Sequence, residues 1–176
     1  MVVGITPEDV LPYLDHVIME FQLNDLQKAA IKAKANFLVA IGCMNTIEFL
    51  GGIETELLGK KEGKAGDRFK AGIQLLSGEY VNPPICDEDI MYELRNGLAH
   101  QYLASIEKMH IRHILIVNDW QTKQAIFRDV DEFTLNVAQL IQDLGMSWRK
   151  LRTTLQTDQA KLTRLAMLLN SLPILQ

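Results

Sequence analysis

The chain has 176 residues, which is the length of one domain and enough to bury a sizeable core. Apolar residues make up 48% of it and charged residues 23%, which excludes an intrinsically disordered chain. The net charge of -4 argues against a general nucleic-acid binder, which carries a basic surplus, although it leaves room for a small basic pocket.

The cysteine count, the first residues and the length of the uncharged runs together predict a soluble, cytoplasmic chain with no membrane partner. Two cysteines, Cys43 and Cys86, are too few for a disulfide scaffold, so buried free thiols in a reducing compartment are expected. The first residues show neither the basic region nor the apolar region of a secretory signal. The longest uncharged run, 35–47, is shorter than the roughly 18–20 residues that cross a bilayer.

The first third of the chain carries two helical patterns. Thr6 predicts an N-cap, and Pro7 is suited to the first helical position. Asn24 and Gln27 form a variant of the capping box and predict the start of a second helix. Apolar residues then recur at helical spacing up to two glycines at 51–52, which predict the end of that helix.

A loop and two further helices follow. Residues 59–66 contain three glycines and three lysines, without the strand and the glycine order that a phosphate-binding loop needs, so they predict an ordinary loop. Asp67 predicts the cap of a short helix that ends at Gly78. The acidic residues 87–89 predict the start of a central helix, because acidic groups stabilise the positive end of the helix dipole.

Strand patterns come next. Two β-rich runs, 111–117 and 124–127, flank a short polar loop and predict one β-hairpin at about 111–128. A lone hairpin is only marginally stable, so this one has to lie on the helices or pair with a partner chain.

The last part of the chain returns to a helical pattern. Asp131 predicts the cap of a long helical region, 131–172, which fits either one helix or two helices broken near 153–158. Threonines are weak helix formers, so the break is favoured. With no repeats or linkers, residues 1–176 predict a single all-α domain, a helical bundle with one β-hairpin insertion.

The central helix carries the highest concentration of polar chemistry among apolar neighbours. Arg95, Asn96, His100 and Tyr102 fall within eight residues. Arg95 and Tyr102 lie on nearly the same helical face, whereas His100 is ~140° around the axis from Arg95. One helix therefore cannot readily bring both groups to a small target. Two copies packed about a two-fold axis could do so in a shared cleft, so the spacing favours a homodimer.

Such a cleft could cleave a phosphodiester bond in RNA. His100 can take the proton from a ribose 2′-hydroxyl, because the pKa of a histidine lies near neutrality. Arg95 offers a fork of donors to the phosphorane, which carries extra negative charge. Asn96 could orient a phosphate oxygen or the imidazole, and Tyr102 could stack on a base or donate to a phosphate. The structural alternative is that Arg95 pairs with Glu88, Glu93 or a neighbouring carboxylate and His100 is a satisfied core histidine.

The segment 95–100 resembles the Arg-x(4–6)-His motif of HEPN domains, and Tyr102 extends it to the Arg-x4-His-x-Tyr form. That form is similar to the motif of HEPN toxins paired with minimal nucleotidyltransferase antitoxins. The resemblance implies a helical bundle, usually dimeric, with endoribonuclease activity that needs no metal or cofactor. It also implies RNA as substrate, an antitoxin partner, and Tyr102 as the residue that the antitoxin AMPylates.

Two functions other than RNA cleavage remain as alternatives. HEPN domains include members that only bind, so a non-catalytic interaction or nucleotide-binding module is the main alternative. Metal binding by His110, His113 and His16 is disfavoured, because His110 and His113 would point to opposite faces of a strand. No serine lies in a nucleophile elbow.

Overall fold

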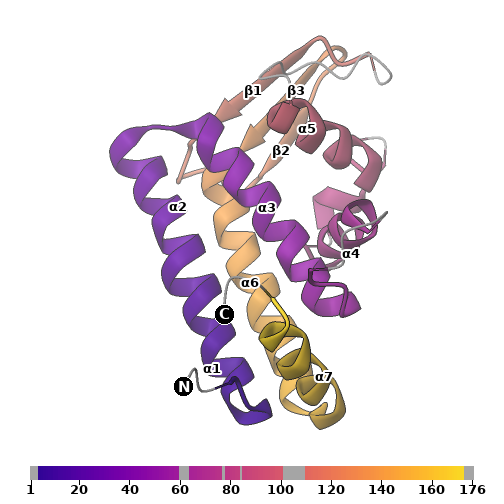
Figure 1. Ribbon diagram of the computed structural model, residues 1–176. Coiled ribbons are helices and arrows are strands. Elements are labelled where there is room, and N and C mark those ends of the chain that lie inside the picture. The colour runs from indigo at the N-terminus through magenta and orange to yellow at the C-terminus, as the bar shows by residue number, and fades with distance from the viewer. Residues whose placement is uncertain (1–3, 60–63, 77, 84, 101–109, 173–176) are drawn as a thin grey trace.

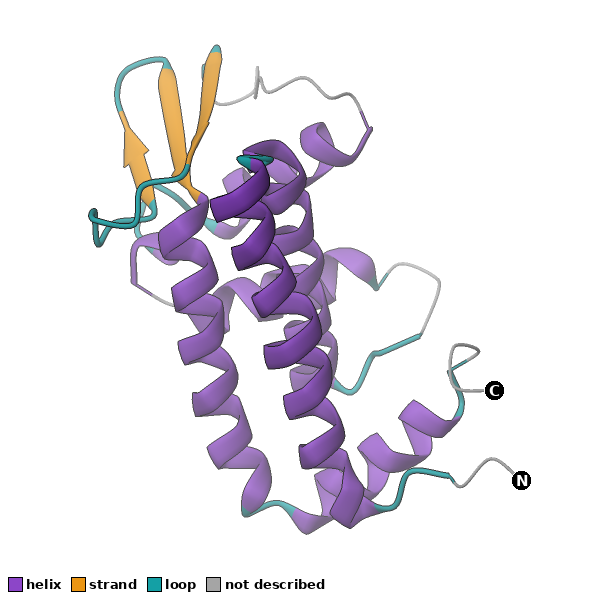
Figure 2. Cartoon of the chain, turned by 90° about the vertical axis from the view of Figure 1, so that its left-hand side faces the viewer, coloured by secondary structure: helices purple, strands orange, loops and turns teal. Residues whose placement is uncertain are grey.

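The computed structural model describes residues 4–59, 64–76, 78–83, 85–100 and 110–172. Long helices run side by side through the molecule, and a small sheet lies at one end of them (Figure 1). Figure 2 shows the same division from the side, with the strands gathered beyond the ends of two long helices. The predicted helical bundle is therefore confirmed in its helical character.

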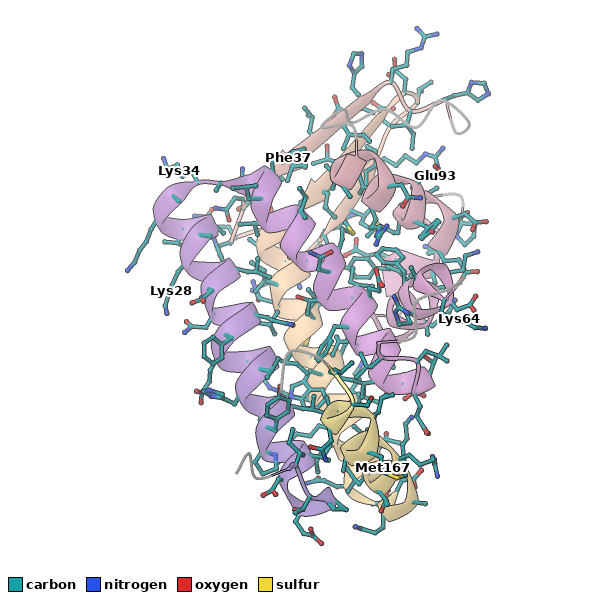
Figure 3. The ribbon with its side chains drawn as sticks, viewed as in Figure 1. Lys28, Lys34, Phe37, Lys64, Glu93 and Met167 are labelled. Carbon is teal, nitrogen blue, oxygen red and sulfur yellow. The ribbon has the colours of Figure 1, made fainter. Side chains whose placement is uncertain are left out.

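Residues 7–33, called the N-terminal helix below, form one continuous helix of five consecutive segments. These are the 3-10 turn η1 (Pro7–Asp9), α1 (Val10–Asp15), the π-helix η2 (His16–Leu23), α2 (Asn24–Lys28) and the π-helix η3 (Ala29–Ala33). The predicted start of a new helix at Asn24 is wrong. Leu23 and Asn24 keep right-handed helical angles, and the cap position before α2 makes no side-chain hydrogen bond. The break falls at Lys34, which has a φ of 50° at the bend before the next helix (Figure 3).

The next helix, α3 (Asn36–Thr55), runs through the glycines that were predicted to end it. Gly51 and Gly52 serve helix packing instead. A Cβ on Gly51 would lie 1.7 Å from the carbonyl oxygen of Arg68, and one on Gly72 would lie 2.0 Å from that of Ile47. α3 and α4 (Ala65–Leu76) therefore touch backbone to backbone, which only glycine permits.

α3 is also the one described helix that is long and apolar enough to cross a membrane. Of its most apolar window, 56% is buried inside the protein, which is what a core helix shows. It lies in the middle of the molecule, between the N-terminal helix on one side and α4 and α5 on the other (Figure 1).

The central helix α5 (Glu88–His100) begins where the acidic residues predicted it. Asp87 Oδ1 accepts a hydrogen bond from the backbone N–H of Ile90 at 2.8 Å, as an N-cap does. Before α5, the 3-10 turn η4 (Gly78–Val81) buries Tyr80, whose hydroxyl donates to Asp143 Oδ2 at 2.7 Å.

The sheet has three strands, β1 (His113–Val117), β2 (Ile126–Arg128) and β3 (Glu132–Asn136), in the order β1-β3-β2. The predicted hairpin between the first two runs is wrong, because both strands pair with β3 instead. β1 is parallel to β3, with Ile114 opposite Phe133, and β2 is antiparallel to it. β3 takes the centre because Phe133 and Leu135, both fully buried, point to the same face of the strand.

The last helical region therefore starts later than predicted. Residues 132–136 are strand, and Asn136 rather than Asp131 caps α6 (Val137–Gln156) by accepting from Ala138 N at 3.2 Å. The favoured break is confirmed at Thr157 and Asp158. α7 (Gln159–Asn170) follows, capped by Asp158, which accepts from Lys161 N at 2.8 Å.

Long-range hydrogen bonds fasten the N-terminal helix to the C-terminal helices. Asp15 accepts from Trp148 Nε1 at 2.9 Å and from Arg152 Nε at 2.8 Å. The amide of Asn170 also pairs with both backbone groups of Ile5 at 2.8 Å. The two ends of the described chain are thus tied directly to each other.

Candidate functional site

Helix α5 places the motif beside its buried face. Ile90, Met91, Leu94 and Leu98 are buried on that face, at spacings that bring them onto one side of a helix. Arg95 follows Leu94 directly, so its side chain starts at the edge of the core and retains 20% exposure. The guanidinium is therefore held between neighbouring elements.

Arg95 is oriented by two oxygen atoms. Its Nη2 donates to Glu48 Oε2 of α3 at 2.9 Å, and its Nη1 donates to Asn96 Oδ1 at 3.1 Å. The Glu48 side chain is 16% exposed. Contacts to a charged group in such a shielded position are stronger than on an open surface. Arg95 and Asn96 are thus brought together, with Asn96 orienting the arginine.

The same carboxylate also holds a second arginine. Arg68 of α4 donates to Glu48 Oε1 from Nε at 3.1 Å and from Nη2 at 2.5 Å. Its Nη1 reaches the carbonyl oxygen of Leu57 at 3.4 Å. Glu48 therefore bridges two guanidinium groups and links three helices. We call Glu48, Arg68 and Arg95 the arginine–glutamate cluster.

Glu48 and Arg68 lie 47 and 27 positions before Arg95, and the motif around Arg95 does not predict them as its partners. One signal was available. Glu48 is one of only two charged residues in the 20-residue helix α3, and a charge in such an apolar helix needs a partner. The sequence has no comparable signal that names the partner, because α4 and α5 reach α3 only through the tertiary fold.

The acidic residues at the start of α5 are not the partners of Arg95. Lys70 of α4 contacts Asp89 at 2.7 Å and Glu88 at 3.7 Å, and Gln74 donates to Glu88 at 3.2 Å. The hydrogen bond to Asp89 raises the pKa of Lys70. The neighbouring carboxylate of the structural alternative is therefore Glu48, a residue distant in sequence.

The other predicted site residues are only partly described. His100 is the last residue of α5, so the helical separation of ~140° between Arg95 and His100 applies to the backbone. The side chain of His100 and the whole of Tyr102 lie outside the described residues.

A small pocket of about 260 Å³ adjoins the cluster. Its lining consists of Asn45, Glu48, Phe49, Leu58, Gly59 and Arg68. Ligand pockets for whole small molecules usually measure ~300–1,000 Å³, so this one has room for one group of a larger ligand.

Among the described residues, no group of three or more His, Cys, Asp or Glu side chains could hold a metal ion. The two cysteines are buried free thiols, as predicted. Burial raises the pKa of Cys43 and raises that of Cys86 to about 12, so both thiols stay protonated at neutral pH. Neither is suited to nucleophilic chemistry.

Comparison of the chain with protein-family models, with curated proteins and with solved structures finds no match. The likeness to HEPN domains therefore rests on the motif in α5.

Proposed function

We propose that the chain is a metal-independent endoribonuclease of the HEPN type, with Arg95, Asn96 and His100 as catalytic residues. One observation carries the proposal. Arg95 is held in a fixed orientation by Glu48 and Asn96, on the helix whose last residue is His100. A preorganised cation is what stabilisation of a phosphorane requires.

The reaction is an internal transesterification of RNA. His100 takes the proton from a ribose 2′-hydroxyl, whose oxygen attacks the adjacent phosphorus atom. Arg95 stabilises the negative charge that gathers on the phosphorane oxygens. The bond to the 5′-oxygen then breaks, and the leaving oxygen receives a proton. The products are a 2′,3′-cyclic phosphate and a free 5′-hydroxyl.

A homodimer completes the site in this proposal, because the ~140° between Arg95 and His100 divides the motif between two faces of α5. The described surface offers apolar area for a second copy to bury. Phe21 is 57% exposed and Leu38 is 64% exposed, on either side of a groove of about 450 Å³ between the N-terminal helix and α3. Exposed apolar groups of this size along one groove are typical of an interface.

The physiological role that fits the motif is that of a cytoplasmic toxin with a nucleotidyltransferase antitoxin. The antitoxin would transfer AMP to the hydroxyl of Tyr102, releasing pyrophosphate from ATP. Co-expression with the neighbouring reading frame, followed by mass spectrometry of the tryptic peptide, tests this step. An unmodified Tyr102 beside an active nucleotidyltransferase would contradict it.

A second candidate is a non-catalytic interaction module. The observation that favours it is the engagement of Arg95 in the arginine–glutamate cluster, which links α3, α4 and α5. In that case Arg95 serves only to hold the three helices together. Replacing it would then unfold the chain, and there would be no RNA cleavage to lose.

The deciding experiment incubates wild-type protein with mixed RNA in EDTA and analyses the ends of the products. We expect 2′,3′-cyclic phosphates, and a ~10²–10⁴-fold slower reaction for His100→Ala. His113→Ala is the matched control, because His113 is an exposed histidine on β1 outside the motif. Absence of cleavage, or equal rates in His100→Ala and wild type, would leave the interaction module as the better explanation.

A further inference from the structure

A pocket of about 480 Å³ lies where the bend after the N-terminal helix meets the end of β1. Its lining consists of Ile31, Lys34, Asn36, Ile116, Val117, Asn118 and Trp120. None of the proposed catalytic residues belongs to this lining. The volume falls within the usual range of ligand sites, ~300–1,000 Å³, and far exceeds the ~30 Å³ that one water molecule fills.

Unpaired polar atoms gather at this pocket. Among the described residues, five buried side-chain nitrogen or oxygen atoms have no hydrogen-bond partner, and three of them belong to residues of the lining. They are Asn36 Oδ1, Asn118 Oδ1 and Trp120 Nε1. Buried polar atoms are normally paired, so three unpaired ones in a single lining indicate that a ligand supplies their partners.

The backbone fixes the orientation of both amides. Nδ2 of Asn36 donates to the carbonyl oxygen of Ile116 at 3.2 Å, and Nδ2 of Asn118 donates to that of Ala30 at 2.6 Å. A carbonyl oxygen can only accept, so each amide has to present its nitrogen to it and its own oxygen is left over. The pocket therefore offers two acceptors to the N–H groups of a ligand.

Trp120 adds a donor to these two acceptors. The Nε1 of an indole can only donate. In the other tryptophan, Trp148, this atom donates to Asp15 at 2.9 Å. In Trp120 it is buried and has no acceptor in the described part of the chain. A ligand that also carries a carbonyl oxygen would satisfy it.

Lys34 supplies a positive charge. It is exposed at the bend (Figure 3), with a φ of 50°. The left-handed position at the end of a helix usually holds glycine, and strained residues concentrate at ligand sites. The ammonium of Lys34 has no ion-pair or hydrogen-bond partner within the ranges that the structure describes. Since no acidic residue lines the pocket, its charge favours an anionic group.

We propose that this pocket binds the carboxyl terminus of a partner peptide whose last residue is apolar. The terminal carboxylate pairs with Lys34. Two backbone N–H groups donate to Asn36 and Asn118, and one backbone carbonyl accepts from Trp120. The last side chain packs against the apolar part of the lining, which is Ile31, Ile116 and Val117.

The end of a peptide combines all four groups that the pocket calls for: neutral N–H donors, a carbonyl acceptor, an anion and an apolar side chain. Capture of a terminal carboxylate is a recurring mode of peptide recognition. The site is separate from the proposed cleavage of RNA, so each can fail without the other.

Isothermal titration of the intact wild-type protein tests the proposal without RNA. The probes are acetyl-alanyl-alanyl-leucine with a free carboxylate, the same peptide as its terminal amide, and acetyl-alanyl-alanyl-glutamate. We expect the amide to bind about tenfold more weakly than the carboxylate, the usual effect of losing a contact to a charged group. The peptide ending in glutamate should also bind more weakly, because a charge would enter the apolar part of the lining. Equal binding of the three peptides, or binding of none, overturns the proposal.

Two variants and a control locate the site. Lys34→Gln should bind the carboxylate about tenfold more weakly and the amide unchanged, so that it no longer distinguishes the two peptides. Trp120→Phe removes the unpaired donor and should weaken both peptides by about two- to tenfold. Lys32→Gln is the matched control, because Lys32 is exposed nearby but outside the lining, and it should bind like wild type.

If Trp120→Phe does not fold, the comparison of Lys34→Gln with Lys32→Gln decides. Equal binding of the carboxylate peptide by Lys34→Gln and wild type contradicts the proposal.

Discussion

At the scale of single residues, Glu48 is a carboxylate that two arginines from two different helices share. One oxygen faces Arg95 and the other faces Arg68, and all three side chains retain between 14% and 20% exposure. Removing a shared partner leaves two shielded guanidinium groups facing each other. The position of Arg95 therefore depends on a residue outside the motif.

We predict that Glu48→Gln destabilises the protein by on the order of 2–3 kcal/mol, somewhat less than breaking a fully buried pair. It should also slow RNA cleavage, because Arg95 loses its fixed orientation. Urea unfolding and the cleavage assay measure the two effects. Glu54→Gln is the control on the same helix. Glu54 is 40% exposed and pairs with Lys161, so its loss should cost about 1 kcal/mol or less. Equal effects of the two variants would remove Glu48 from the site.

A second prediction at this scale concerns the effect of Tyr80 on stability at alkaline pH. Burial and the adjacent Asp143 carboxylate raise the pKa of Tyr80 well above its usual value of 10.0. In the unfolded chain the phenol of Tyr80 loses its proton near pH 10. In the folded chain the phenol is still protonated at that pH. The unfolded state thus binds fewer protons above pH 10, and stability falls by up to ~1.4 kcal/mol per pH unit there.

The measurement is the free energy of unfolding between pH 9 and 11, for wild type and Tyr80→Phe. Phenylalanine cannot ionise, so the difference between the two proteins should shrink as the pH rises. Gln139 still donates to Asp143 in the variant, at 2.8 Å, so the carboxylate keeps one partner. Parallel curves for the two proteins across this range would contradict the prediction.

At the scale of elements, close contacts between helices decide which glycines are indispensable. We predict that Gly72→Ala destabilises the protein by about 1–3 kcal/mol or more, because its Cβ would meet the backbone of Ile47. Gly145→Ala, in a helix with room for a Cβ, should instead stabilise it by about 0.5–1 kcal/mol. Thermal unfolding measures both variants. If Gly145→Ala lost as much stability as Gly72→Ala, the close spacing of α3 and α4 would not explain the destabilisation by Gly72→Ala.

Sequence patterns predicted the elements with local signals and missed those decided by distant contacts. The starts at Thr6 and Asp87 rest on a side chain next to its own helix, and both are confirmed. The glycines at 51–52 look like a stop signal, yet their role depends on α4. Asp131 and the helical spacing of Phe133 and Val137 predict a helix over residues 131–136, although Phe133, Leu135 and Val137 also alternate as in a strand. Pairing with β1 decides for a strand.

The residues of the candidate site also fall into those that a local sequence pattern reveals and those that only the fold brings together. The motif was visible because its residues fall within eight positions of the sequence, and Asn96 does contact Arg95. Glu48 and Arg68 reach Arg95 only through the packing of α3 and α4 on α5, which no sequence pattern specifies. The pocket of about 540 Å³ between the N-terminal helix and α6 is also lined by residues more than a hundred positions apart, such as Met19 and Met146.

At the scale of the whole molecule, the proposed homodimer can be tested on the exposed apolar groove. We predict that wild-type protein is a dimer at micromolar concentration and that Leu38→Glu makes it a monomer, because a charge would be buried in the interface. Met167→Glu is the control. Met167 is 63% exposed on α7, at the end of the molecule opposite the sheet (Figure 3). Multi-angle light scattering reports both, and a monomeric wild-type protein would count against the composite site.

The hydrogen bonds that fasten the N-terminal helix have a consequence for how the protein is made. Asp15 meets Trp148 and Arg152 across 133 and 137 positions of sequence, and Ile5 meets Asn170 across 165. During translation, the first helix leaves the ribosome long before these partners exist. Contacts between distant positions slow folding, so the apolar face of this helix stays exposed until its partners in α6 and α7 are available. The nascent chain should therefore be a client of chaperones that bind exposed apolar helices, until α6 and α7 have been synthesised.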